Sequence, residues 1–131
     1  MSLVLLLSPY DGDDSRMDLI VRVKEIKGQC PVYKVGDTFV LKSGYKLVTE
    51  IPICMHSLAS LLPYYNALQV SEPSQWGLAG KDDKTKAYVQ CPDPMAYTGG
   101  GTATLEIDRV LNPKETGPGQ AGLLACAKKR A

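Results

Sequence analysis

The chain has 131 residues, of which 44% are hydrophobic and 22% are charged, and its formal net charge at neutral pH is +1. A chain of this size and composition is expected to fold as one packed domain that needs no disulfide or metal for its stability. The near balance of acidic and basic residues argues against nucleic acid or an anionic membrane surface as the main partner. No apolar run reaches the roughly 18 residues that a membrane span requires.

Residues 1–17 are predicted to form an N-terminal arm or an edge strand. Their apolar run, Leu3–Leu7, has no basic residue before it, and Ser8-Pro9-Tyr10 after it does not resemble a small-residue cleavage site. A secretory signal is therefore not expected, and the run is a candidate for an extra strand or for docking on a partner. We expect a cytoplasmic protein, in which four cysteines are more typical of free, metal-bound or catalytic thiols than of disulfides.

Residues 18–111 are predicted to form the core domain, mainly from strands. Alternating apolar and polar side chains and turn signals such as Ser43-Gly44 indicate where the strands begin and end. Strands are predicted at 18–26, 38–41, 45–48, 87–89 and 102–108. From residue 112 to residue 131 the chain is rich in glycine and proline, which predicts a C-terminal tail outside the core.

One stretch, residues 57–68, has a strong helical pattern. Pro63 lies within it and would kink a continuous helix, so we expect two short helices, the first capped by Ser57 and the second beginning at Pro63. Apolar residues occupy nearly all sides of this stretch, which predicts that the helices are largely buried. The expected fold class is α+β, with a small antiparallel sheet of four or five strands covered on one face by a kinked helical segment.

Three cysteines and the sole histidine are candidate metal ligands: Cys30, Cys54, His56 and Cys91. Cys30 and Cys91 each precede a proline at the end of a predicted strand, where the backbone is rigid, and the two strands could be neighbours. Cys54 and His56 lie at a helix entrance, where backbone N–H groups favour a thiolate. Zinc or an iron–sulfur cluster fits this ligand set. Because no C-x₂-C pair is present, buried structural cysteines and a hydrogen-bonded histidine are the alternative.

A catalytic thiol is a second alternative for the same residues. His56 is the only imidazole that could act as the base for any of the three cysteines, and Asp37 or Asp93 would orient its ring. Residues two apart on a helix point in different directions, so Cys54 is a poor direct partner for His56 unless it precedes the helix.

Three segments together resemble a family of short bacterial and archaeal proteins of unknown function: Cys30–Asp37 (CPVYKVGD), Ile53–Leu58 (ICMHSL) and Cys91–Pro94 (CPDP). Members of that family share a CPxxKxGD-like turn, a cysteine just before a helix and a late Cys-Pro or Cys-Asp turn. The resemblance covers about residues 19–110 and implies that the three cysteines of these segments are the family signature, whereas Cys126 lies outside it. By analogy with small cysteine-bearing proteins that accompany larger anaerobic or redox enzymes, it implies a subunit role.

We therefore expect a small non-catalytic accessory domain with a Cys/His metal site that docks on a larger, anaerobic or redox, enzyme or on a second copy of itself. The alternatives are a small enzyme with a cysteine thiolate and His56 as its base, and a plain interaction module with structural cysteines. Neither nucleic acid nor a membrane is expected as a partner.

Overall fold

The computed structural model describes residues 16–111, so the predicted C-terminal tail and all of the N-terminal arm before Arg16 lie outside the described residues. The strands are β1 (Met17–Gly28), β2 (Thr38–Lys42), β3 (Lys46–Val48), β4 (Ala87–Gln90) and β5 (Gly101–Leu111). The helices are α1 (Met55–Leu61), α2 (Tyr65–Val70), the 3₁₀ helix η1 (Pro73–Trp76) and α3 (Met95–Thr98). The predicted α+β class with a small antiparallel sheet is confirmed.

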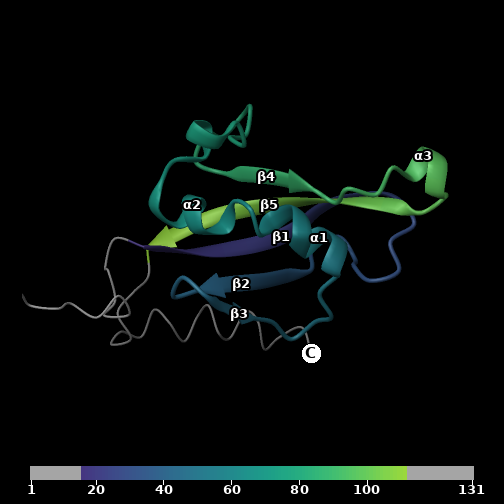
Figure 1. Cartoon of the computed structure of the whole chain (residues 1–131), viewed down its shortest axis with the longest axis horizontal. Coiled ribbons are helices and arrows are strands. Elements are labelled where there is room, and N and C mark those ends of the chain that lie inside the picture. The colour runs from purple at the N-terminus through teal and green to yellow at the C-terminus, as the bar shows by residue number, and fades with distance from the viewer. Residues whose placement is uncertain (1–15, 112–131) are drawn as a thin grey trace, which may run out of the picture.

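The described strands form one antiparallel sheet in the order β3-β2-β1-β5-β4 (Figure 1). Its longest ladder joins β1 to β5 and runs from the pair Met17–Leu111 to the pair Gly28–Gly101. β1 and β4 flank β5 on its two sides, and both run antiparallel to it. The two flanking strands therefore point in the same direction, and their C-terminal ends lie at the same end of the sheet.

The hydrophobic core lies on one face of the sheet. Successive side chains of a strand point to opposite faces, so the alternation seen in the sequence places every second residue on this face. The buried residues are Leu19, Val21 and Val23 of β1, Phe39 and Leu41 of β2, Ala87 and Val89 of β4, and Ala103, Leu105 and Ile107 of β5. Leu61 of α1 and Leu68 of α2 belong to the same cluster. α1 contacts β4, α2 contacts β1, and Figure 1 shows both helices in front of the sheet.

The first helix begins earlier than the sequence predicted. Cys54 is its N-cap and has an extended backbone (φ −72°, ψ 125°), and the helix starts at Met55. The prediction that Ser57 caps the helix is wrong, because this residue is buried inside α1 and its hydroxyl donates to the Cys54 carbonyl at 2.9 Å. Pro63 lies in the turn between the helices, and α2 begins at Tyr65. The proline separates two short helices, as predicted, but does not start the second one.

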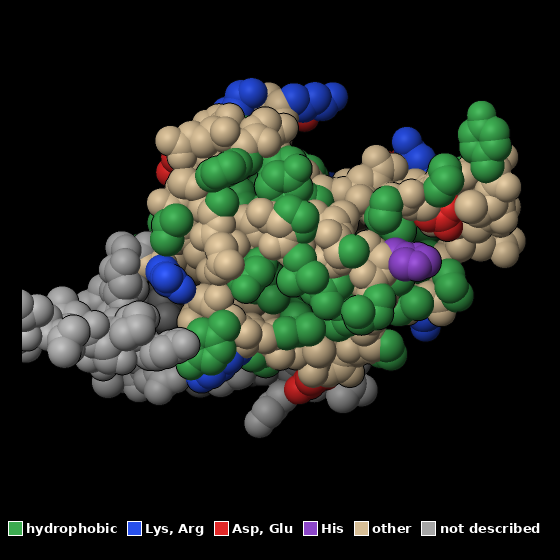
Figure 2. All heavy atoms as spheres, in the orientation of Figure 1, with side chains coloured by type: hydrophobic (Ala, Val, Ile, Leu, Met, Phe, Trp, Pro, Cys, Tyr) green, Lys and Arg blue, Asp and Glu red, His purple; other side chains and the backbone are tan. Residues whose placement is uncertain are grey.

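The two helices are only half buried, so the prediction that they are largely buried is wrong. In α1 only Ser57 and Leu61 are buried, whereas Met55 is 73% exposed, and Leu62 directly after the helix is 52% exposed. A short helix that lies on a sheet covers one of its own sides, and apolar residues on its other sides are buried only by a further layer. Apolar side chains are accordingly visible over α1 and α2 in Figure 2.

Candidate functional site

Cys30 and Cys91 lie at the same end of the sheet, where β1 and β4 finish, but on different sides of β5. Cys30 follows the last residue of β1 by two positions, and Cys91 directly follows β4. Their strands are not neighbours, because β5 lies between them. The Cys91 turn is tied to β5 by two hydrogen bonds, from its own N–H to the Ala103 carbonyl at 2.9 Å and from the Thr102 hydroxyl to its carbonyl at 2.8 Å.

Tyr33 connects the first Cys-Pro turn to the start of α1. Its backbone N–H donates to Cys30 Sγ at 3.3 Å, and its hydroxyl oxygen accepts the Cys54 N–H at 2.9 Å. The same hydroxyl lies 2.7 Å from Ser57 Oγ. Tyr33 thus contacts two of the three described cysteines at its two ends.

The phenol of Tyr33 is held in its neutral form. Burial raises its pKa above the ordinary value of 10.0, and the hydrogen bonds with Ser57 and Cys54 offset this only in part. Negative charge on Cys54 or Cys30 would raise the pKa further. The hydroxyl therefore keeps its proton at physiological pH and positions the backbone of α1 rather than acting as a base. No local sequence pattern predicts this role, although Tyr33 lies within the CPVYKVGD motif.

The variant Tyr33→Phe is expected to lower the free energy of unfolding by about 1–3 kcal/mol, because the Cys54 N–H and Ser57 lose a buried partner while the ring stays in place. Urea unfolding of the purified chain measures this change. Tyr97→Phe is the matched control, since Tyr97 is 93% exposed and is expected to change stability by less than about 0.5 kcal/mol. Equal stabilities of the two variants would contradict the role of the Tyr33 hydroxyl.

The four predicted metal ligands do not form a cluster. The thiols of Cys30, Cys54 and Cys91 are free and half buried, and His56 is exposed on the first turn of α1. Within residues 16–111 no group of three or more histidine, cysteine, aspartate or glutamate side chains is placed so that it could hold a metal ion. A zinc or iron–sulfur site at these residues therefore stays a prediction from the sequence.

A cluster of charged residues crosses the face of the sheet opposite the core. At its centre is Glu106 of β5, which is only 2% exposed. Its carboxylate accepts hydrogen bonds from Arg22 at 3.2 Å, Lys86 at 3.2 Å and Tyr88 at 2.8 Å. Lys24 lies within 3.5 Å. Glu106 therefore connects its own strand to both of its neighbours, β1 and β4.

The environment of Glu106 keeps its carboxylate ionised. Burial by itself raises the pKa of Glu106, but the hydrogen bonds from Tyr88 and Lys86 and the charges of Lys86 and Lys24 outweigh it, so that the pKa lies below its ordinary value. The bond to Glu106 also raises the pKa of Lys86 and that of Tyr88. Each of these side chains forms its hydrogen bond or ion pair with Glu106. This arrangement indicates a structural cluster rather than a general acid or base.

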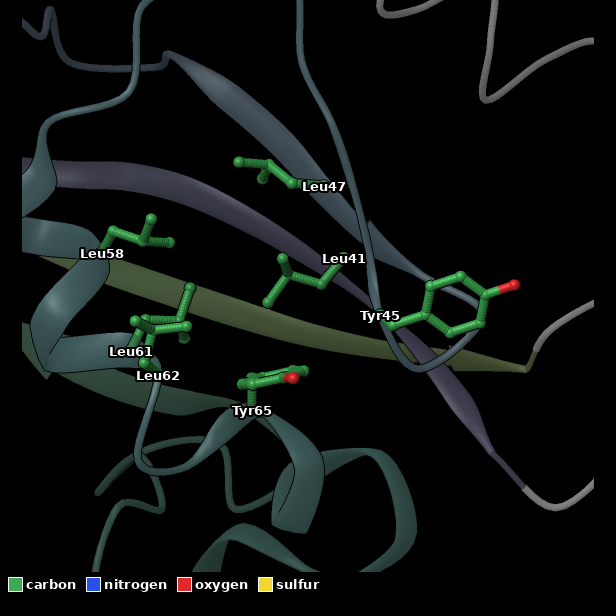
Figure 3. A pocket seen from close by; sticks show the side chains of 7 residues that line it. All are labelled: Leu41, Tyr45, Leu47, Leu58, Leu61, Leu62 and Tyr65. Atoms are coloured by element: carbon green, nitrogen blue, oxygen red, sulfur yellow. The ribbon is translucent and has the colours of Figure 1, made fainter. Parts of the chain in front are cut away.

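An apolar hollow opens between the β2–β3 hairpin and the two helices. Its volume is about 120 Å³, and its lining consists of Leu41, Tyr45, Leu47, Leu58, Leu61, Leu62 and Tyr65. Figure 3 shows the side chains from the helices on one side and those of the hairpin on the other. None of the described residues that line it is charged. The sequence does not predict this site, because its signal, apolar residues on all sides of the helical stretch, is also the pattern of buried helices.

Among residues 16–111, two exposed cations lie beside the hairpin turn. Lys46 is exposed, and its Nζ lies 5.8 Å from the centroid of the Tyr45 ring, which lines the hollow. The exposed side chain of Arg16 lies against Gly44, within 2.5 Å of where a β-carbon would stand. The nearby carboxylate of Asp18 is buried beneath the turn, where it accepts the backbone N–H of Ser43. The hollow thus has a cationic rim on its hairpin side.

Gln69 is an exception to the usual pairing of buried polar groups. It is 1% exposed, one helical turn beyond Tyr65, and neither polar atom of its side chain has a hydrogen-bond partner among residues 16–111. Such a buried unpaired amide costs about 1–3 kcal/mol. Gln69→Met, which keeps a similar shape, is therefore expected to raise the free energy of unfolding by about 1–2 kcal/mol in urea titrations. Gln75→Met, at an exposed position, is the control, and a gain of the same size there would contradict the explanation.

Comparisons with protein-family models, with curated proteins and with solved structures found no match. The resemblance to the family of short bacterial and archaeal proteins therefore stays a prediction from the three cysteine-containing segments. Among the helices of residues 16–111, none has both the length and the apolar character needed to cross a membrane.

Proposed function

We propose that this chain is a non-catalytic docking module that holds an aliphatic side chain of a larger protein in the hollow between the β2–β3 hairpin and the helices α1 and α2. The observation that supports this proposal is an uncharged, apolar lining that remains open to solvent. Tyr45 is 65% exposed, Leu62 52% and Leu47 39%. A hollow with an apolar lining is the kind of concave site in which proteins bind apolar groups.

The size and rim of the hollow define the expected partner. A cavity of about 150 Å³ with an aliphatic and aromatic lining holds a molecule as large as benzene, so the hollow of about 120 Å³ suits one leucine-sized side chain. The exposed cations at its hairpin side, Lys46 and Arg16, favour acidic residues next to that anchor. The partner is therefore expected to present an aliphatic segment next to acidic residues.

Fluorescence anisotropy with a labelled peptide tests the proposal. The probe is a fluorescein-labelled peptide in which a run of leucines precedes a run of aspartates, titrated with the full chain. Leu62→Asp places a charge in the hollow and is expected to weaken binding by at least about tenfold, or about 1.4 kcal/mol. Val70→Asp is the matched control, because Val70 is similarly apolar and 57% exposed but does not line the hollow. The same affinity for both variants would contradict the proposal.

Metal binding by Cys30, Cys54, His56 and Cys91 is a separate proposal that comes from the sequence pattern alone. It concerns a different part of the molecule, because none of these residues lines the hollow. Elemental analysis of anaerobically purified full chain tests it. Zinc or iron at a near-stoichiometric level supports it, and the absence of both removes it without affecting the docking proposal.

A further inference from the structure

We infer that the chain's own N-terminal segment, Leu3–Leu7, occupies the hollow when no partner is bound, so that segment and partner compete for one site. The inference rests on the proposed docking function and adds its regulation. Its basis is the position at which the N-terminal segment joins the described structure, together with the match between the chemistry of that segment and the chemistry of the hollow.

The segment joins the described structure beside the hollow. Arg16 directly precedes β1, and its side chain lies against Gly44 in the hairpin turn. Gly44 is the neighbour in sequence of Tyr45, which lines the hollow. Residues 8–15 connect Leu7 to Arg16 and can span up to about 30 Å when extended. The apolar run can therefore reach the hollow without any rearrangement of the described strands.

The chemistry of the segment matches that of the hollow and its rim. Leu3–Leu7 consists of consecutive aliphatic residues, and we assign the leucine-sized anchor to Leu5 and Leu6 in it. Asp11, Asp13 and Asp14 lie between this run and Arg16, where they can face the cations Lys46 and Arg16. This combination, an aliphatic anchor with acidic residues nearby in the chain, is the one expected of the partner.

The C-terminal tail is a poorer match. It also leaves the sheet nearby, since Leu111 pairs with Met17, and it contains two adjacent leucines, Leu123 and Leu124. Its charges after that pair, however, are those of Lys128-Lys129-Arg130, which a cationic rim repels. Charge complementarity therefore favours the N-terminal segment as the occupant.

Competition within one chain has a measurable consequence. A short flexible connection gives the tethered segment an effective concentration in the millimolar range. If the segment fills about 90% of the hollows, the apparent dissociation constant of a partner rises about tenfold, because only the open fraction binds. Removing the aliphatic anchor from the segment should abolish this penalty.

The test uses the full chain and the same labelled leucine–aspartate peptide. The variant Leu5→Ser/Leu6→Ser removes the anchor and is expected to bind the peptide about tenfold more tightly than the unchanged chain does. The matched control is Leu123→Ser/Leu124→Ser, which removes two leucines from the C-terminal tail and is expected to leave the affinity unchanged. Sedimentation of the same samples is expected to show a monomer in each case.

Each alternative has its own result. Equal affinity for the unchanged chain and for Leu5→Ser/Leu6→Ser overturns the competition but leaves the docking function in place. If only Leu123→Ser/Leu124→Ser binds the peptide more tightly, the C-terminal tail occupies the hollow, and the proposal for Leu3–Leu7 is overturned. If the unchanged chain is a dimer and Leu5→Ser/Leu6→Ser is a monomer, the segment binds the hollow of a second copy, and competition within one chain is overturned. Absence of binding to all of these chains at millimolar concentrations removes the docking function as well.

Discussion

Gly101→Ala is expected to lower the free energy of unfolding by about 3 kcal/mol or more. Gly101 begins β5 and packs against the backbone of Gln29, next to the first Cys-Pro turn. A β-carbon at this position would lie 2.5–2.7 Å from the oxygen, carbon and nitrogen atoms of Gln29. Because these are backbone atoms, rotation of a side chain cannot relieve the contact, and the β1–β5 ladder must open at this end. Thermal and urea unfolding of the purified chain measure the loss.

Gly77→Ala is the matched control for this substitution. Gly77 has a positive φ of 68°, but a β-carbon there would have nothing within 4 Å. Gly77→Ala is therefore expected to lower the free energy of unfolding by only roughly 1–2 kcal/mol, which is the cost of a side chain in a left-handed backbone conformation. The prediction fails if Gly101→Ala is no more destabilising than Gly77→Ala. That result would mean that the close packing of Gly101 against Gln29 does not hold the Cys30 turn in place at the end of the sheet.

Glu106→Ala is expected to cost about 3 kcal/mol at neutral pH, because it removes the buried carboxylate that Arg22, Lys24 and Lys86 share. Asp108 remains beside Arg22 and Lys86, at 3.6 Å and 3.5 Å. These cations are 27–58% exposed, so water limits the penalty to the lower part of the range for buried pairs. Glu25→Gln is the control. Glu25 pairs with Lys27 at 3.6 Å on the exposed surface, and its loss is expected to cost less than about 0.5 kcal/mol.

The charged cluster also predicts the pH dependence of stability. The folded-state pKa of Glu106 lies below the ordinary value of 4.5, so its contribution is fully present above about pH 4.5 and is lost as the pH falls through the folded-state pKa. Glu106→Gln removes this titration. The stability difference between the unchanged chain and Glu106→Gln is therefore expected to be greatest at neutral pH and to shrink on acidification. A difference that stays constant from pH 7 to pH 3 would contradict the lowered pKa.

The strands could be predicted because their signal is local. Alternation at 18–26 and 102–108 identified β1 and β5, and the Ser43-Gly44 signal identified the β2–β3 hairpin. The prediction that Ser57 caps α1 is wrong, although serine is a suitable residue type for a cap. The Ser57 hydroxyl bonds with Tyr33, 24 positions earlier in the chain, and this contact places Ser57 inside the helix.

The charged cluster and the hollow could not be predicted for a related reason. Glu106 is one acidic residue in an alternating strand, and its importance comes from Arg22 and Lys86, which the sheet order places on either side of it. The hollow combines residues 41–47 of the hairpin with residues 58–65 of the helical stretch. Each stretch has an apolar pattern of its own, but no local pattern records that the two face each other.

By itself the sequence determined the α+β class, the strands of the sheet, the break at Pro63 and the Cys-Pro turns at the ends of β1 and β4. These features depend on hydrophobic periodicity and on the restricted backbone of proline, which act over a few residues. Only the tertiary structure decided that β5 separates Cys30 from Cys91, that Glu106 joins three strands, and that an apolar hollow opens beside a cationic rim. Those features depend on the order of strands in the sheet, which is set by contacts between residues far apart in the chain.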